Sequence, residues 1–253
     1  MFKSHFLINR KVTKTISFEN SRKLEKFMRM YEDRYFGRLV CLARKPERLL
    51  GQNGYVFLLC SLSRSRGLFS GMLDSMNQSN LALAFLAVRA HFETTGSVAY
   101  FFRYLQKFYG GEITYTQMDH VLRRLSLGGK EFPAEKKNDP HWVDAINVLT
   151  MIDEADRLFN EMAKGKVNIF RESYNFLSEF CHPNLFGLRI FTDLNNSKVP
   201  PQEYFYKTSE FKRKDPTSLL SHLNISCNFF FPIYDKCFSL IKEREETPDL
   251  FKT

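Results

Sequence analysis

A line of polar residues interrupts the most apolar stretch of the chain, residues 81–105, whose sequence is LALAFLAVRAHFETTGSVAYFFRYL. At 3.6 residues per turn, Arg89, Glu93 and Tyr100 lie on one narrow face of the helix that this stretch predicts. Charged groups in a protein core are costly unless neighbouring groups compensate them, so this face needs polar partners on another helix. It is therefore either a functional site or a buried network that fixes how the helices pack.

A matching set of polar residues occurs in the segment YNFLSEFCHPN. Tyr174, Ser178 and His182 recur at helical spacing, and the last two are one turn apart. Because two polar faces in a helical core can satisfy one another, we expect His182 to meet Arg89 and Glu93, and these three are the candidate catalytic residues. In the competing interpretation, His182 only caps the end of its helix. The residues expected around the candidate site are Tyr174, Ser178, Tyr100 and Asn184.

Other catalytic arrangements fit the sequence poorly. A triad of Ser178, His182 and Glu93 would lack a nucleophile elbow and the oxyanion donors that acyl transfer requires. Cys181 and His182 are adjacent in a predicted helix, so their side chains point to different faces. The histidines are dispersed without metal-ligand spacing, and no glycine-rich phosphate loop is present. We therefore predict no metal and no cofactor.

The formal net charge is +9, and nearly all of the excess lies near the N-terminus. Residues 1–50 hold 13 Lys and Arg against 5 Asp and Glu, whereas residues 51–253 hold 24 against 23. This asymmetry indicates a basic surface for RNA, another polyanion or an acidic protein partner, or else a solvated basic helix. The candidate nucleic-acid-binding residues lie in a basic helix and in a later loop: Arg22, Lys23, Lys26, Arg29 and Arg34, and Lys212, Arg213 and Lys214.

The cysteine pattern and the hydropathy bear on cellular location. The five cysteines are scattered and show neither metal nor redox spacing, which is typical of reduced thiols. The first residues lack the apolar core of a signal peptide, and no apolar stretch is uninterrupted enough to cross a membrane. We therefore expect a soluble, cytoplasmic protein.

Hydrophobic periodicity predicts helices over most of the chain. A short turn between the second and third of them predicts a long antiparallel pair, with Ser79 capping and Gly110 ending the central helix. We therefore predict an all-α bundle over 51–253, preceded by a basic segment, 1–50, in which residues 2–18 could form a short hairpin. Residues 194–215 are expected to be irregular. The expected helices cover 21–43, 55–76, 81–105, 114–127, a segment starting at Asp139-Pro140, 166–181, and a segment from Asp215-Pro216 to Lys242.

Two short motifs carry a resemblance to known proteins. Arg89 and Glu93 form an R-x-x-x-E pattern, and the segment from Tyr174 to Asn184 fits Y-x-x-L-S-x-x-x-H-P-N. In these motifs the chain resembles bacterial all-α proteins that are similar in layout to HEPN-type domains of the abortive-infection and toxin type. The resemblance covers roughly residues 55–190. It implies a metal-independent endoribonuclease of phage defence, often dimeric, in which a histidine acts as acid and base and an arginine stabilises charge on the phosphodiester.

One spacing departs from the pattern of those nucleases, in which the arginine precedes the histidine closely. Arg171 and His182 are eleven positions apart, which is about 16 Å along a straight helix, so Arg89 would have to supply the charge. Two other interpretations stay open. One is a non-catalytic interaction module with a basic docking face and a structural polar network, and the other is a small-molecule pocket between the long helices.

Overall fold

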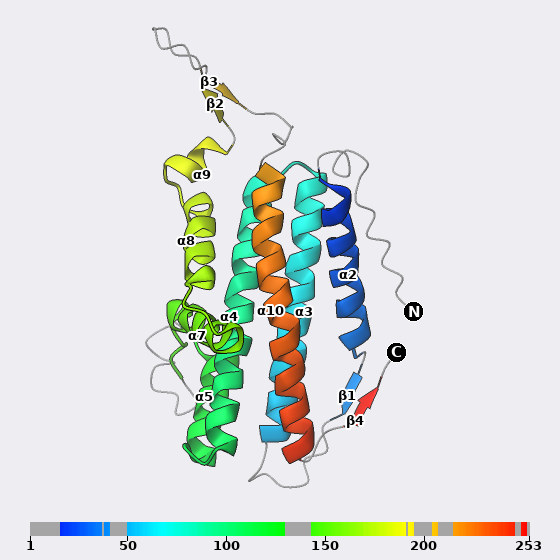
Figure 1. Ribbon diagram of the computed structural model, residues 1–253, viewed down its shortest axis with the longest axis vertical. Coiled ribbons are helices and arrows are strands. Elements are labelled where there is room, and N and C mark those ends of the chain that lie inside the picture. The colour runs from blue at the N-terminus through cyan, green and yellow to red at the C-terminus, as the bar shows by residue number, and fades with distance from the viewer. Residues whose placement is uncertain are drawn as a thin grey trace, which may run out of the picture.

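The computed structural model is a helical bundle, so the all-α fold is as predicted (Figure 1). The structure describes residues 16–36, 38–40, 50–129, 143–190, 192–194, 204–206, 215–245 and 249–251. The helices in this part of the chain are α2 (Phe18–Arg34), α3 (Leu50–Asn77), α4 (Leu81–Tyr109), α5 (Tyr115–Leu127), α7 (Val148–Ala163), α8 (Ile169–Cys181), α9 (Leu185–Arg189) and α10 (Asp215–Arg244). Two antiparallel ribbons accompany them: β1 (Arg38–Val40) pairs with β4 (Asp249–Phe251), and β2 (Thr192–Leu194) with β3 (Tyr204–Tyr206).

Helix α4 lies at the centre of the bundle, as its apolar sequence predicts. It packs against α3 and α10 on one side and against α5, α7 and α8 on the other (Figure 1). The turn between α3 and α4 is short, and Ser79 takes a left-handed conformation in it with φ 58°. Asn80 caps α4 by accepting a hydrogen bond from the Leu83 amide, so the expected cap at Ser79 is wrong by one residue. Gly110 ends the helix as expected.

Helix α2 packs on this bundle. Its Leu24, Phe27 and Tyr31 belong to the same buried core as the residues of α3, α4 and α10. The helix ends at Arg34 rather than near Ala43, because the chain turns extended at Tyr35 and then pairs as β1 with the distant strand β4. No local sequence pattern predicts the pairing of β1 with β4. The hairpin expected over 2–18 falls almost wholly outside the described residues.

Helix α7 starts later than expected. Asn147 caps it, and residues 143–147 are not helical, since Gly129 forms a β-bridge with Asp144. The expected start at Asp139-Pro140 lies outside the described residues. Helix α8 ends at Cys181 with His182 as its C-cap, as predicted. The region expected to be irregular, 194–215, contains strand β3, which pairs with β2.

A buried histidine joins four helices. His91 of α4 has no exposed surface, and its Nε2 atom lies 2.8 Å from the hydroxyl of Tyr31 on α2 and 2.7 Å from that of Ser65 on α3. Its Nδ1 atom lies 2.7 Å from the Ser226 hydroxyl of α10, which also contacts Thr95 at 2.8 Å. Burial lowers the pKa of His91 to about 3, so the imidazole is neutral in the folded protein at neutral pH. We call these five residues the His91 network.

Acid should destabilise the protein through His91. Its pKa is about 3 when folded and near 6.5 when unfolded, so only the unfolded chain gains this proton in that interval. The resulting stability is intact above about pH 6.5 and falls as the pH drops, by about 1.4 kcal/mol per pH unit. Urea unfolding should therefore show the advantage of wild type over His91→Gln shrinking by about 2 kcal/mol between pH 7.5 and pH 5.

The control is His120→Gln, because His120 is exposed on α5. This variant should follow the wild-type pH dependence. An advantage of wild type over His91→Gln that is equal at both pH values would contradict the neutral, buried state of His91.

Candidate functional site

Arg89, Glu93 and Tyr174 form one hydrogen-bonded cluster between α4 and α8. Nη2 of Arg89 donates to the Tyr174 hydroxyl at 2.8 Å, and that hydroxyl donates to Oε1 of Glu93 at 3.2 Å. The guanidinium also lies 5.1 Å from the centre of the Tyr174 ring, and its Nε atom lies 3.6 Å from Glu93 Oε1. Burial opposes the charge of Arg89, but Tyr174 and Glu93 outweigh it and raise the pKa of the guanidinium.

Contacts at the start of α8 set the position of Tyr174. Asp156 of α7 accepts hydrogen bonds from the backbone amides of Phe170 and Arg171 at 2.8 and 2.9 Å, and so caps α8 from outside. The Arg171 side chain forms two hydrogen bonds with Asp153 of α7, at 2.8 and 2.5 Å. These contacts join the start of α8 to α7.

Gly96 allows α7 to approach α4 closely. A Cβ atom at this position would lie 3.1 Å from the backbone carbonyl atoms of Met151 on α7. A larger residue would push α7 outward, because a backbone carbonyl cannot rotate away as a side-chain end can. The absence of a side chain at Gly96 therefore lets the backbone of Met151 lie close to α4.

That space is a cleft of about 660 Å³ between α3, α4, α5, α7 and α8, which we call the α4 cleft. Arg64 of α3 lines it opposite α4 and donates from Nε to the Thr94 hydroxyl at 3.2 Å. The polar lining residues include Arg64, Arg89, Glu93, Thr94, Ser97 and Tyr174. The apolar lining residues include Val56, Phe57, Leu125, Ile146, Val148 and Met151. The cleft thus combines apolar walls with a few charged groups, as small-molecule sites do.

The other candidate site residues do not join this cluster in the described structure. His182 is exposed, and none of the described hydrogen bonds or ion pairs joins its imidazole to Arg89 or Glu93. Ser178 donates to the Tyr174 carbonyl oxygen at 2.7 Å, within its own helix. Tyr100 packs on Tyr104, with ring centres 4.6 Å apart.

The C-cap of α8 and the start of α9 have their own polar contacts. The His182 amide donates to the Ser178 carbonyl oxygen at 3.1 Å. The Asn184 side chain accepts hydrogen bonds from the Phe186 and Gly187 amides, both at 3.1 Å, and so caps α9. These contacts match the capping and turn roles that the sequence offered as the alternative for His182 and Asn184.

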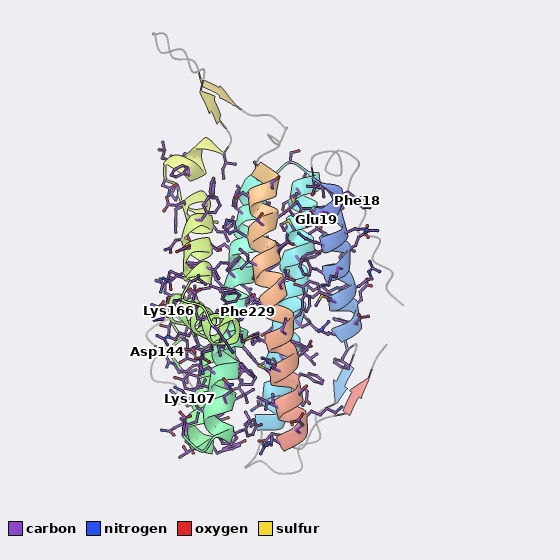
Figure 2. The ribbon with its side chains drawn as sticks, in the orientation of Figure 1. Phe18, Glu19, Lys107, Asp144, Lys166 and Phe229 are labelled. Atoms are coloured by element: carbon purple, nitrogen blue, oxygen red, sulfur yellow. The ribbon has the colours of Figure 1, made fainter. Side chains whose placement is uncertain are left out.

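The candidate nucleic-acid-binding residues of α2 divide into two groups. Arg22, Lys26 and Arg29 are exposed, and their spacing places them along one face of α2. Lys23 pairs with Glu19 at 2.6 Å, near the N-terminal end of α2 where Phe18 and Glu19 are labelled (Figure 2). Arg34 forms two 2.7 Å hydrogen bonds with Asp235 of α10, so it serves packing of α2 on the bundle. Lys212, Arg213 and Lys214 lie outside the described residues.

Arg64 and His91 were not among the site residues predicted from the sequence. Ser61, Arg64 and Ser65 recur at helical spacing within a largely apolar helix, and this was the available signal for a polar face on α3. For His91, periodicity places it on the opposite side of α4 from Arg89. Which helices cover that side depends on tertiary contacts between segments up to 135 residues apart.

Comparison with known proteins adds no relative. No protein-family model, curated protein or solved structure matches this chain. No helix in the described part of the chain is long and apolar enough to cross a membrane. Among the same residues, no group of three His, Cys, Asp or Glu side chains is placed to hold a metal ion.

Removing the Tyr174 hydroxyl should destabilise the protein. In Tyr174→Phe, Nη2 of Arg89 loses its acceptor and Glu93 loses a donor, which should cost about 1–2 kcal/mol. The matched control is Tyr234→Phe, because the Tyr234 hydroxyl is buried without a hydrogen-bond partner, so its removal should be neutral or stabilising. Free energies of unfolding in urea would compare them. Equal losses in the two variants would show that the cluster contributes nothing to stability.

Proposed function

We propose that the protein binds a small ligand in the α4 cleft. The observation that carries this proposal is the cleft itself, a space of about 660 Å³ that two arginines and Tyr174 line together with apolar residues. Ligand pockets commonly measure about 300–1,000 Å³ and pair apolar walls with a few fixed polar groups. Arg89 is already held by Tyr174 and Glu93, so a ligand would meet a group whose orientation is set in advance.

The geometry favours binding over catalysis. General acid–base chemistry needs a titratable group within hydrogen-bond reach of the reacting atoms. Among the described residues of the cluster, Glu93 is engaged by Tyr174 and Arg89, and the nearby Ser178 hydroxyl donates within its own helix. His182 is exposed and has no described contact with the cluster. The non-catalytic interpretation of the polar network is therefore the one that these contacts support.

A neutral fluorescent probe would test ligand binding. N-phenyl-1-naphthylamine should bind wild type with one site and increased fluorescence, because the walls of the cleft are largely apolar. Ser97→Trp should abolish this, since an indole at Ser97 would fill space in the cleft. The matched control is Ser221→Trp, at an exposed serine of α10 outside the cleft. Binding that is unchanged in Ser97→Trp, or absent in wild type, would refute the proposal.

A second candidate function, RNA binding or cleavage, is favoured by the exposed cations of α2. Arg22, Lys26 and Arg29 could neutralise phosphates along one face, in keeping with the HEPN-like resemblance. This candidate brings with it a cytoplasmic role in phage defence and a homodimer in which His182 of one chain would meet Arg89 of the other. The same face would suit an acidic protein partner in the non-catalytic interpretation.

RNA binding should depend on these cations and on salt. The double variant Lys26→Ala/Arg29→Ala should bind a labelled single-stranded RNA with a weaker salt dependence, measured by fluorescence anisotropy. The slope of log K against log salt concentration should become smaller by about 1.4, which corresponds to the loss of two phosphate contacts. Lys166→Ala/Lys242→Ala, which removes two exposed lysines elsewhere, is the control. In EDTA, wild type should also cleave total RNA while His182→Ala and Arg89→Ala, checked for folding, should not. No binding and no cleavage by wild type would exclude this candidate.

A further inference from the structure

We infer that the ligand of the α4 cleft is an amphipathic small molecule with a single negative charge, such as a carboxylate on a compact apolar body. The inference rests on the proposed binding function and adds the chemical class of the ligand. It draws on three observations: the charge balance of the cleft, the hydrogen-bonding capacity of its arginines and the composition of its walls.

The net charge of the cleft lining favours a ligand with one negative charge. Arg64 and Arg89 bring two positive charges to the cleft and Glu93 brings one negative charge, so the described lining carries one net positive charge. Glu93 is held at Arg89 by the Tyr174 hydroxyl and is not free to leave. A monoanion would neutralise the remaining charge, whereas a dianion would leave an excess beside the carboxylate of Glu93.

The arginines retain donors for such a group. Within the described part of the chain, Arg64 forms a hydrogen bond through Nε to Thr94, and Arg89 forms one through Nη2 to Tyr174. Each guanidinium has five N–H groups in a planar fork. The Nε atom of Arg89 is buried and faces Glu93 Oε1 at 3.6 Å, so the donors left for a ligand are the remaining N–H groups of the two guanidinium groups. Two oxygens of a carboxylate match this geometry.

The apolar walls of the cleft favour an apolar body for the rest of the ligand. Val56 and Leu127 are exposed at the cleft, and Val148, Met151 and Leu125 continue its apolar lining. The free energy falls when a hydrocarbon group displaces water from apolar surface of this kind. A polyphosphate or a length of RNA would offer neither the apolar surface nor the single charge. An amphipathic monoanion satisfies both parts of the lining at once.

Three ligands with eight carbon atoms each separate the effect of charge from that of size: octanol, octanoate and octyl phosphate, at pH 8, where the phosphate is a dianion. Isothermal titration calorimetry on wild type should show octanoate binding about tenfold or more tightly than octanol, because charged hydrogen bonds discriminate by at least this factor. Octyl phosphate should bind no more tightly than octanoate. Arg64→Gln should bring the affinity for octanoate close to the affinity for octanol, and it should fold normally because Arg64 is exposed.

A charge-altering variant tests the balance directly. Glu93→Gln keeps a hydrogen-bond acceptor for Tyr174 but raises the net charge of the lining by one. The affinity for octyl phosphate relative to that for octanoate should therefore rise by about tenfold. Unchanged relative affinities would contradict the proposed role of Glu93.

The outcomes distinguish failure of the inference from failure of the proposed function. If octanol binds wild type as tightly as octanoate, and both are lost in Ser97→Trp, the cleft binds ligands but the monoanion inference is wrong. Tighter binding of octyl phosphate than octanoate to wild type would also overturn the inference. If none of the three binds, or if all bind equally to wild type and Ser97→Trp, the proposed function itself fails.

Discussion

The bundle depends on a neutral imidazole at its centre. His91 has no exposed surface, and its two ring nitrogens contact hydroxyl groups on α2, α3 and α10. Each ring nitrogen of a neutral histidine either donates or accepts, and a hydroxyl can do both, so the network can satisfy every buried polar atom at once. A charged imidazolium in the same place would have no carboxylate beside it among the described contacts. The position of four helices is thus tied to one protonation state.

The same helix carries a second polar face with a different role. Residues two positions apart on a helix are separated by about 200° around its axis, so Arg89 and Glu93 point away from His91 and Thr95. The first pair meets Tyr174 of α8 at the edge of the α4 cleft, and the second is enclosed in the core. The His91 network therefore holds α4 against α2, α3 and α10, which leaves the Arg89 face available for a ligand.

Parts of this arrangement could be predicted and parts could not. Apolar periodicity and Gly110 placed α4 and its end, and helical spacing placed Tyr174 among the residues expected around Arg89 and Glu93. The same spacing did not bring His182 to that cluster in the described structure, because a position one turn beyond Ser178 is the C-cap of α8, where the backbone turns extended. Helical phase holds only while the helix continues. Arg34 was predicted to lie on a basic binding face. Its partner Asp235 lies 201 residues away, so local sequence could not reveal the contact.

By itself, the sequence determined that the chain is an all-α bundle around residues 81–105 and that this central helix needs polar partners, because both follow from local periodicity and the cost of buried charge. Only the tertiary structure decided which partners those are. It placed His91 among hydroxyl groups of three other helices and brought Arg64 of α3 to the same cleft as Arg89. Side-chain contacts across helices depend on packing angles and on close approaches such as that at Gly96, and local sequence does not encode these.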